Sequence, residues 1–274
     1  MTNTQTRVLT AVVVVPILLV LIAVGGAPWG LFVSAVAGIG AYEFYDMARA
    51  RGFKPQAIAG ILTSFCFCVA VTFRVPNLAF GVLVFGAFVI MTLELMRGDP
   101  KGAIENLGAS FAGIIYVGVL LSHAILIRQF HGNNKLGIFF IIVALAGSFL
   151  CDTGAYFVGR AYGKRKLIPK ISPGKTVEGT IGGIITGILA VCVTKGIADI
   201  FMTTGFGWSK AALLGIGITI GGIIGDLIES MLKRDAGVKD SGKIVPGHGG
   251  ILDRLDSLLW AIPVTYYFAA WAVK

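Results

Sequence analysis

The sequence predicts an all-α, polytopic integral membrane protein with about nine transmembrane helices and two functional cytoplasmic loops. The first observation is composition: 56% of the 274 residues are hydrophobic and only 14% are charged, against about 25% charged residues in soluble domains. The second is that apolar runs recur along the whole chain, many of them close to the roughly 20 residues that cross a hydrocarbon core. A soluble all-α protein is excluded, because no soluble fold needs so many long uncharged stretches.

The expected spans follow in chain order from these apolar runs. The first begins after Arg7, and we interpret it as a retained span because Pro28 directly follows the candidate signal-peptide cleavage point. Hydrophilic loops between the spans are mostly short, and only residues 159–177 and 233–252 form longer ones. The nine expected spans are residues 8–25, 29–48, 56–73, 77–96, 107–128, 136–158, 178–201, 210–232 and 253–273.

The distribution of Lys and Arg predicts the orientation, because cytoplasmic loops carry an excess of these residues. With a cytoplasmic N-terminus and alternating spans, most of the 23 Lys and Arg residues fall on the cytoplasmic side, chiefly within 49–54, 97–101, 160–175 and 233–254. The acidic residues follow the same pattern, and only Asp199 falls clearly outside. The net charge of +9 is therefore interpreted as a basic face beside anionic lipid that serves anionic substrates, and not as a nucleic-acid surface.

Polar residues are concentrated in the later spans, which predicts two parts of the chain with different functions. We expect an N-terminal transmembrane scaffold over residues 1–105 and a catalytic transmembrane half over residues 106–274, which contains both long loops. The acids Glu43, Asp46 and Glu94 lie at helix ends near basic loops, and we interpret them as structural. Glycines at helical spacing, such as Gly183 and Gly187, predict close packing between helices, with a dimer seam as the alternative.

The densest charge lies in residues 226–256, which hold six carboxylates, five Lys or Arg residues, one His and five Gly. Asp226 is expected near the cytoplasmic end of the eighth span. Asp253 and Asp256 open the ninth span and would share one helix face. Converging carboxylates repel one another unless a cation binds, and Mg²⁺ usually takes one or two carboxylates together with phosphate oxygens. A helix macrodipole explains Asp253 or Asp256 alone, but it does not explain Asp226 at a C-terminal helix end.

The loop between these acids offers groups that bind phosphate. Lys233, Arg234, Lys239 and Lys243 are cationic, and the glycines of His248-Gly249-Gly250 let backbone N–H groups approach a ligand closely. These glycines lead into the expected start of the ninth span, which is itself an anion-binding position. A plain solvated basic loop is the alternative.

The other long loop contains Ser172-Pro-Gly-Lys175, which we interpret as a rigid turn that presents a hydroxyl and an ammonium group at the mouth of the seventh span. Gly174-Lys175-Thr176 is not read as a P-loop, because no strand is expected before it and the first glycine of that motif is missing. Asp152 lies about six residues inside the sixth span. A carboxylate there requires a metal, a ligand, or a packed Ser, Thr or Lys.

Two longer blocks of sequence contain these residues. One runs from Asp152-Thr-Gly-Ala-Tyr156 through Gly163-Lys-Arg-Lys to Ser172-Pro-Gly-Lys175-Thr and Glu178-Gly179. The other runs from Ser230-Met-Leu-Lys-Arg through Lys239-Asp240-Ser-Gly242 to Pro246-Gly-His248-Gly-Gly-Ile-Leu-Asp253-Arg254-Leu-Asp256. Both resemble the signature blocks of the phosphatidate cytidylyltransferases (CDP-diacylglycerol synthases). The departures are slight: Val245 and Cys151 stand where other small or apolar residues are usual, and neither is charged.

This resemblance implies transfer of a cytidylyl group from CTP to phosphatidate, giving CDP-diacylglycerol and pyrophosphate. It also implies Mg²⁺, an active site on the cytoplasmic face of the membrane (the inner membrane in a bacterium), and a homodimer. The identity of any second cation stays open. The expected metal ligands are Asp226, Asp253 and Asp256. The other expected catalytic residues are Lys233, Arg234, Lys239 and His248. The expected substrate-binding residues are Asp152, Ser172, Lys175, Asp240, Gly249, Gly250 and Arg254.

Two other classes of function share parts of this pattern. One is another CTP-dependent lipid enzyme, such as a polyprenol or phytol kinase. The other is an ion-coupled transporter, whose acids are expected near the bilayer midplane within broken helices of repeated halves. Here the acids gather at the expected cytoplasmic ends and no repeat is visible, which favours the enzyme.

Overall fold

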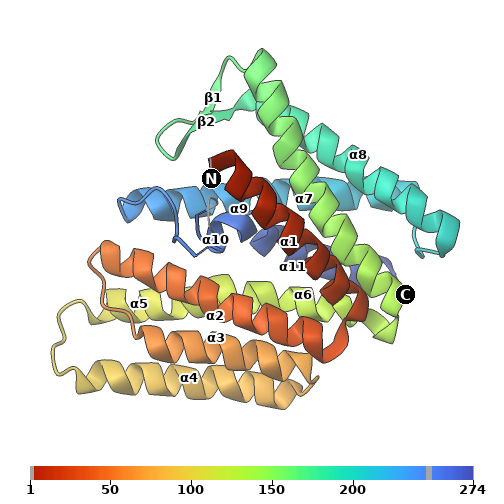
Figure 1. Cartoon of the computed structure of the whole chain (residues 1–274). Coiled ribbons are helices and arrows are strands. Elements are labelled where there is room, and N and C mark those ends of the chain that lie inside the picture. Colours follow the sequence, from red (N-terminus) through yellow and green to blue (C-terminus); the bar gives the residue numbers. More distant parts are fainter. Residues whose placement is uncertain (1–2, 245–248, 274) are drawn as a thin grey trace. The chain divides into compact units, whose positions relative to one another are not determined.

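The computed structural model describes residues 3–244 and 249–273, and Figure 1 shows them as helices joined by short connections. The described residues are all-α, as predicted, apart from one small hairpin. The helices of the first half are α1 (Asn3–Val24), α2 (Gly26–Ala50), α3 (Ala57–Thr72), α4 (Pro76–Met96), α5 (Ala103–Gly113), the π-helix η1 (Ile114–Val119), α6 (Leu120–Arg128) and the 3₁₀ turn η2 (Phe130–Gly132). There follow α7 (Asn134–Tyr162), β1 (Lys166–Ile168), β2 (Ser172–Thr176), α8 (Val177–Phe201), α9 (Trp208–Asp235), α10 (Leu252–Leu255) and α11 (Leu258–Ala272).

Five helical stretches of the described residues are long and apolar enough to cross a membrane. They are Pro76–Met96, Ala103–Gly132, Asn134–Tyr162, Val177–Phe201 and Trp208–Asp235. Three shorter apolar helices, Val12–Val24, Ala57–Thr72 and Leu258–Ala272, accompany them. These lengths and compositions are those of an integral membrane protein. The predicted total of nine spans remains a prediction.

The side chains of α8 show how such a helix divides its surface. Ile181, Ile185 and Leu189 recur every four residues and are more than half exposed, as expected for a face that contacts lipid. The opposite face carries Gly183 and Gly187, both buried. A side chain at Gly183 would approach the Cys151 carbonyl oxygen of α7 to 2.8 Å, so these glycines allow the two helix backbones to approach each other closely. The prediction of glycine-mediated packing within the chain is confirmed here.

The chain forms two compact units. One contains residues 1–126 and 232–255, and the other contains residues 127–231 and 256–274. Helix α9 passes from the second unit into the first, so the C-terminal signature block is divided between them. We refer to them below as the first and second unit. The functional division predicted at residue 105 stays a prediction, because these units are defined by packing alone.

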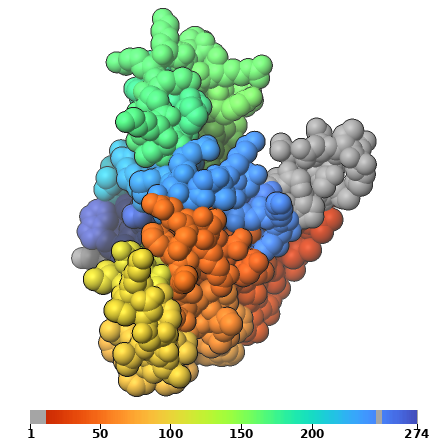
Figure 2. Space-filling view, turned by 90° about the vertical axis from the view of Figure 1, so that its left-hand side faces the viewer, coloured from red at the N-terminus to blue at the C-terminus, as the bar shows by residue number. Residues whose placement is uncertain are grey.

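Within the first unit, α2, α3, α4 and α5 lie side by side (Figure 1). Tyr45 of α2 fits against Gly60 and Gly113, where any larger residue would overlap its ring, and its hydroxyl donates to the Ser110 carbonyl oxygen at 2.7 Å. Figure 2 shows in yellow the connection between α4 and α5 with the adjoining helix ends. Large apolar side chains such as Phe85 and Leu95 are exposed on α4. Tight internal packing of α2 therefore coexists with an apolar outer surface.

Within the second unit, the long loop between α7 and α8 forms an antiparallel hairpin. Lys166 pairs with Thr176, and Ile168 pairs with Ser172. The predicted turn at Ser172–Lys175 is wrong, because those residues form strand β2 and the turn lies at residues 169–171. The expectation that no strand precedes the Gly-Lys-Thr sequence is also wrong. The missing first glycine still argues against a P-loop, since Pro169 stands in its place.

Candidate functional site

A pocket of about 440 Å³ in the second unit contains three residues that the sequence singled out. Asp152 comes from α7, Lys175 from β2 and Asp226 from α9, and Arg160 of α7 also lines the pocket. The Lys175 Nζ lies 2.6 Å from the Asp226 Oδ2. The hairpin holds Lys175 in place because Thr176, the next residue, caps α8 by accepting a hydrogen bond from the Gly179 N–H. An ammonium group therefore faces a carboxylate inside a pocket.

A second carboxylate shares this environment. The Ser257 hydroxyl donates to the Asp152 Oδ2 at 3.4 Å, and Asp152 interacts electrostatically with Asp226, Asp256 and Lys175. Three acids predicted from sequence thus influence one another within the second unit. These like charges disfavour one another, and the ammonium group of Lys175 offsets part of that repulsion.

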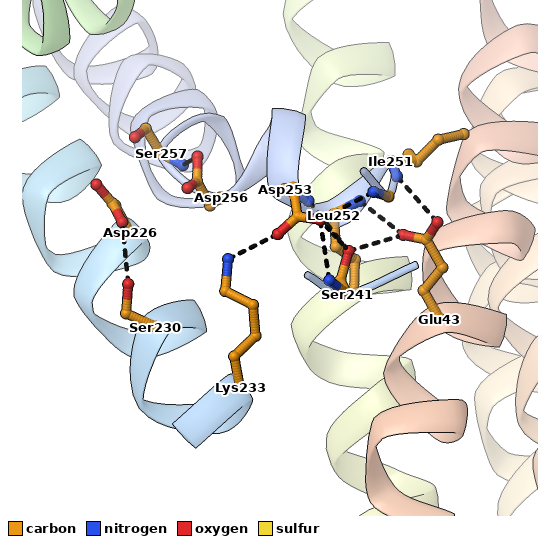
Figure 3. Close-up of polar contacts among 11 residues, drawn as sticks. Glu43, Asp226, Ser230, Lys233, Ser241, Ile251, Leu252, Asp253, Asp256 and Ser257 are labelled. Carbon is orange, nitrogen blue, oxygen red and sulfur yellow. Dashed lines mark hydrogen bonds and ion pairs between the residues drawn. The ribbon is translucent and has the colours of Figure 1, made fainter. Parts of the chain in front are cut away.

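Asp253 lies at the centre of a separate hydrogen-bond network in the first unit, drawn in Figure 3. Its Oδ1 is 2.6 Å from the Lys233 Nζ. Its Oδ2 accepts from the Ser241 N–H at 2.9 Å and from the Gly250 N–H at 2.8 Å, and the Ser241 hydroxyl oxygen lies 3.0 Å from it. Burial alone would raise the pKa of Asp253, but the hydrogen bonds and the charge of Lys233 outweigh burial and lower the pKa below its ordinary value.

Glu43, which we interpreted from the sequence as structural, lies beside this network in the structure. Glu43 is 1% exposed and comes from α2. Its Oε1 accepts from the Ile251 N–H at 3.0 Å, and its Oε2 accepts from the Leu252 N–H at 2.9 Å. The Ser241 hydroxyl oxygen also lies 3.2 Å from Oε2, and its single proton is shared between Glu43 and Asp253. In Figure 3 Ser241 lies between Glu43 and Asp253. An acid at the end of an apolar helix was the only signal for this role in the sequence.

The predicted start of the ninth span requires correction. Asp253 belongs to the four-residue helix α10, whereas Asp256 lies in the turn before α11. The two acids therefore do not share one face of a single continuous helix. Helix α9 also continues to Asp235, so Asp226 lies more than two turns before its C-terminal end and not at the end.

The long loop at residues 233–252 is called the signature loop below. Two of its glycines, Gly249 and Gly250, contact Asp253 of the same chain. Gly249 has a positive φ of 88°, in the region that favours glycine, and a side chain there would approach the Asp253 Oδ2 to 2.7 Å. The Gly250 N–H donates to Asp253. Any contact of this N–H with phosphate would require it to leave that carboxylate.

The other predicted residues are distributed as follows. Lys239 and Asp240 are exposed and line a pocket of about 710 Å³ in the first unit, together with Glu43, Asp46 and Lys243. Arg234 and Arg254 are exposed, and Ser172 is half-buried in β2. His248 lies outside the described residues.

The predicted sharing of one ion by Asp226 and Asp253 remains a prediction, because the two acids belong to different units. Over residues 3–244 and 249–273, no group of three or more His, Cys, Asp or Glu side chains is gathered closely enough to hold a metal ion by itself.

Comparison with known proteins decides the family. The chain matches the profile of the cytidylyltransferase family from residue 5 to residue 272. The chain belongs to that family. Among curated members, it is 32% identical to the phosphatidate cytidylyltransferase of Bacillus subtilis, over 98% of this chain and 99% of that protein. It is 38% identical to the enzyme of the same name from Pseudomonas aeruginosa, over 97% and 96% of the two chains. The corresponding Synechocystis enzyme is 34% identical, over 96% and 95%.

Membership in the cytidylyltransferase family confirms the resemblance inferred from the two sequence blocks. Because the match extends over nearly the whole chain, it includes α2 and Glu43 as well as the residues of both blocks.

Proposed function

We propose that this protein transfers a cytidylyl group from CTP to phosphatidate, giving CDP-diacylglycerol and pyrophosphate for phospholipid synthesis. The observation that carries the proposal is the full-length match to the cytidylyltransferase family, with relatives named phosphatidate cytidylyltransferase that align over at least 95% of their length. The membrane helices are consistent with a lipid substrate, whose tails would enter between helices while its phosphate stays at the interface.

The reaction needs positioning more than proton transfer. A phosphate oxygen of phosphatidate attacks the α-phosphorus of CTP, a new P–O bond forms, and the bond from the α-phosphorus to the bridging oxygen breaks to release pyrophosphate. The nucleophile is already an anion, so no strong general base is required. The protein must bring two polyanions together and stabilise the charge that develops on the α-phosphate and the leaving group.

The carboxylates that we assign to the metal are of the ligand type that a magnesium ion prefers. Asp226 and Asp253 would hold it, with Asp256 as a further candidate, since hard cations prefer carboxylate oxygens. In the structure each of the first two acids has a lysine Nζ 2.6 Å away, Lys175 and Lys233 respectively, so an ammonium group supplies positive charge where a cation would bind. When bound, Mg²⁺ would neutralise triphosphate oxygens.

The remaining predicted residues would act on the substrates through charge and backbone donors. Lys175 and Lys233 would leave their carboxylate partners and, together with the exposed arginines, would neutralise phosphates. The backbone at Gly249 and Gly250 would contact the leaving pyrophosphate. The residues assigned to these contacts are Lys175, Lys233, Arg234, Lys239, Arg254, His248, Gly249 and Gly250. Asp152, Ser172 and Asp240 would support the nucleotide. We further propose that this site faces the cytoplasm, following the Lys and Arg distribution, and that the protein is a homodimer.

The test uses purified protein in lipid nanodiscs that contain phosphatidate, with CTP labelled at the α-phosphate. We expect label to enter the lipid fraction only when Mg²⁺ is present, together with release of unlabelled pyrophosphate. Transfer of label only from CTP carrying it at the γ-phosphate would indicate a lipid kinase. The absence of transfer from either nucleotide would refute the proposal.

A further inference from the structure

We infer that Glu43 is a positioning residue for the proposed reaction: through Ser241 and the backbone of residues 251–252, it sets the orientation of Asp253. The inference rests on the proposed function, because it concerns the carboxylate to which we assign a metal ion. According to this inference, α2, a helix of the expected scaffold, contributes a residue that shapes the proposed active site.

The buried Glu43 carboxylate has its hydrogen-bond acceptors filled by donors from the signature loop and α10. A carboxylate has only acceptors, and the donors around Glu43 all belong to the segments that carry Asp253: two backbone N–H groups, and the single Ser241 hydroxyl proton that Glu43 shares with Asp253. A carboxylate that is 1% exposed is tolerated when it is hydrogen-bonded in this way. Glu43 therefore attaches α2 to residue 241 and to residues 251–252.

The loop follows the shape of the Glu43 carboxylate so closely that a side chain at Gly242 or Gly250 would overlap it. The loop backbone is thus held against Glu43, and the same backbone provides the Gly250 N–H that donates to Asp253. A change in the size or charge of Glu43 must displace this backbone.

Ser241 connects the two carboxylates of Glu43 and Asp253. The Ser241 hydroxyl lies 3.2 Å from the Glu43 Oε2 and 3.0 Å from the Asp253 Oδ2, and the Ser241 N–H also donates to Asp253. Glu43 and Asp253 are therefore connected by one residue. With the Ser241 and Gly250 N–H groups fixed on Oδ2, Asp253 presents Oδ1 toward Lys233, which is the oxygen that we expect to reach the cation.

The main variant is Glu43→Gln, which keeps the side-chain shape. Because Oε1 and Oε2 each accept a backbone N–H, either orientation of the amide places its NH₂ against a donor. The matched control is Glu94→Gln in the same unit. Glu94 is 5% exposed and accepts from Gln56 at 2.9 Å and from Asn106 at 3.0 Å, away from the signature loop.

Two measurements without substrate test the positioning. In hydrogen–deuterium exchange, Glu43→Gln should accelerate exchange of the amides at 250–252 by about 10- to 100-fold, the equivalent of one lost hydrogen bond to a charged group. Binding of Mn²⁺, titrated by electron paramagnetic resonance, should weaken by about tenfold, as is typical when the residues that orient a metal ligand are changed. Glu94→Gln should leave both values as in the wild type.

Activity assays separate this inference from the proposed function. With folded protein normalised, Glu43→Gln should lower kcat and raise the Mg²⁺ concentration for half-maximal rate, with little change in the KM for CTP. Ser241→Ala should have a smaller effect, and the double variant should lose less than the product of the two single losses. An active wild type beside a Glu43→Gln variant with unchanged Mn²⁺ affinity and kcat overturns the inference alone. A wild type that neither binds Mn²⁺ nor transfers label overturns the inference and the proposed function together.

Discussion

The ion pair of Lys233 and Asp253 offers a quantitative test of how the signature loop is held. Both side chains are largely buried, at 15% and 6% exposure, and their charged atoms are 2.6 Å apart. Asp253→Asn keeps the shape of the side chain but removes its charge. The Asn oxygen can still accept from Ser241 and Gly250, so the amide NH₂ then faces the Lys233 ammonium group.

The expected loss follows from these contacts. A hydrogen bond to a charged group contributes about 1.5–3 kcal/mol, and breaking a fully buried pair costs about 3–5 kcal/mol. Lys233 lies near the end of α9 and keeps some exposure, so we expect a loss of about 2–4 kcal/mol in the free energy of unfolding. At about 2–4 °C for each kcal/mol, the apparent melting temperature should fall by about 4–16 °C.

The assay is thermal unfolding of purified protein in one detergent at one scan rate. Adding Lys233→Met to Asp253→Asn should recover part of the loss, because the Lys233 ammonium group then no longer faces an amide where the carboxylate stood. The control is Asp235→Asn, which breaks an ion pair with Arg51 whose side chains are 50% and 59% exposed. That change should cost at most about 1 kcal/mol. Equal melting temperatures for Asp253→Asn and Asp235→Asn would refute the reasoning.

Three further predictions follow from the same structure. Because the pKa of Asp253 is lowered in the folded protein, its contribution to stability is complete above its unfolded pKa of about 3.9 and is lost as the pH falls through the folded value. Between pH 6 and pH 3 the melting temperature of the wild type should therefore fall more steeply with decreasing pH than that of Asp253→Asn. An equal pH dependence of the two melting temperatures would contradict this. Gly183→Val should destabilise the α7–α8 packing by about 1–3 kcal/mol, whereas Ile185→Val on the exposed face should be nearly neutral in the same melting assay. Asp226→Asn should lower kcat for label transfer by about 10²–10³-fold with an unchanged circular dichroism spectrum, and Asp235→Asn should retain activity. Near-full activity of Asp226→Asn would reject its role at the metal.

The elements that the sequence predicted well are those governed by local pattern. The apolar runs over 77–96, 136–158, 178–201 and 210–232 each correspond to a helix long enough to cross a membrane, because apolar length is decisive in a bilayer. The small-residue stripe of α8 likewise predicted its buried face. Short-range turn chemistry was less reliable. Ser172-Pro-Gly-Lys175 has the composition of a turn, yet it pairs with β1 as a strand, since cross-strand hydrogen bonds overrode the local preference.

The acidic residues show where such prediction ends. Asp152 and Lys175 were selected from the first sequence block and Asp226 from the charged stretch at 226–256, and the three line one pocket. The partner of each charge was not foreseen. Nothing in the spacing of residues indicated that Lys175 would pair with Asp226, or that Lys233 would pair with Asp253. The break between α10 and α11 was also missed, because Asp253 and Asp256 were interpreted as the polar first turn of one continuous apolar helix.

By itself, the sequence determined the membrane class, the helical architecture, the family and most of the charged residues of the candidate site. Each of these depends on residue type or on periodicity within one segment. Only the tertiary structure identified Glu43 as a partner of the signature loop. Its hydrogen bonds reach residues 208 and 209 positions away in the chain. A buried carboxylate takes its donors from whichever backbone packs against it, and that choice is made by the fold.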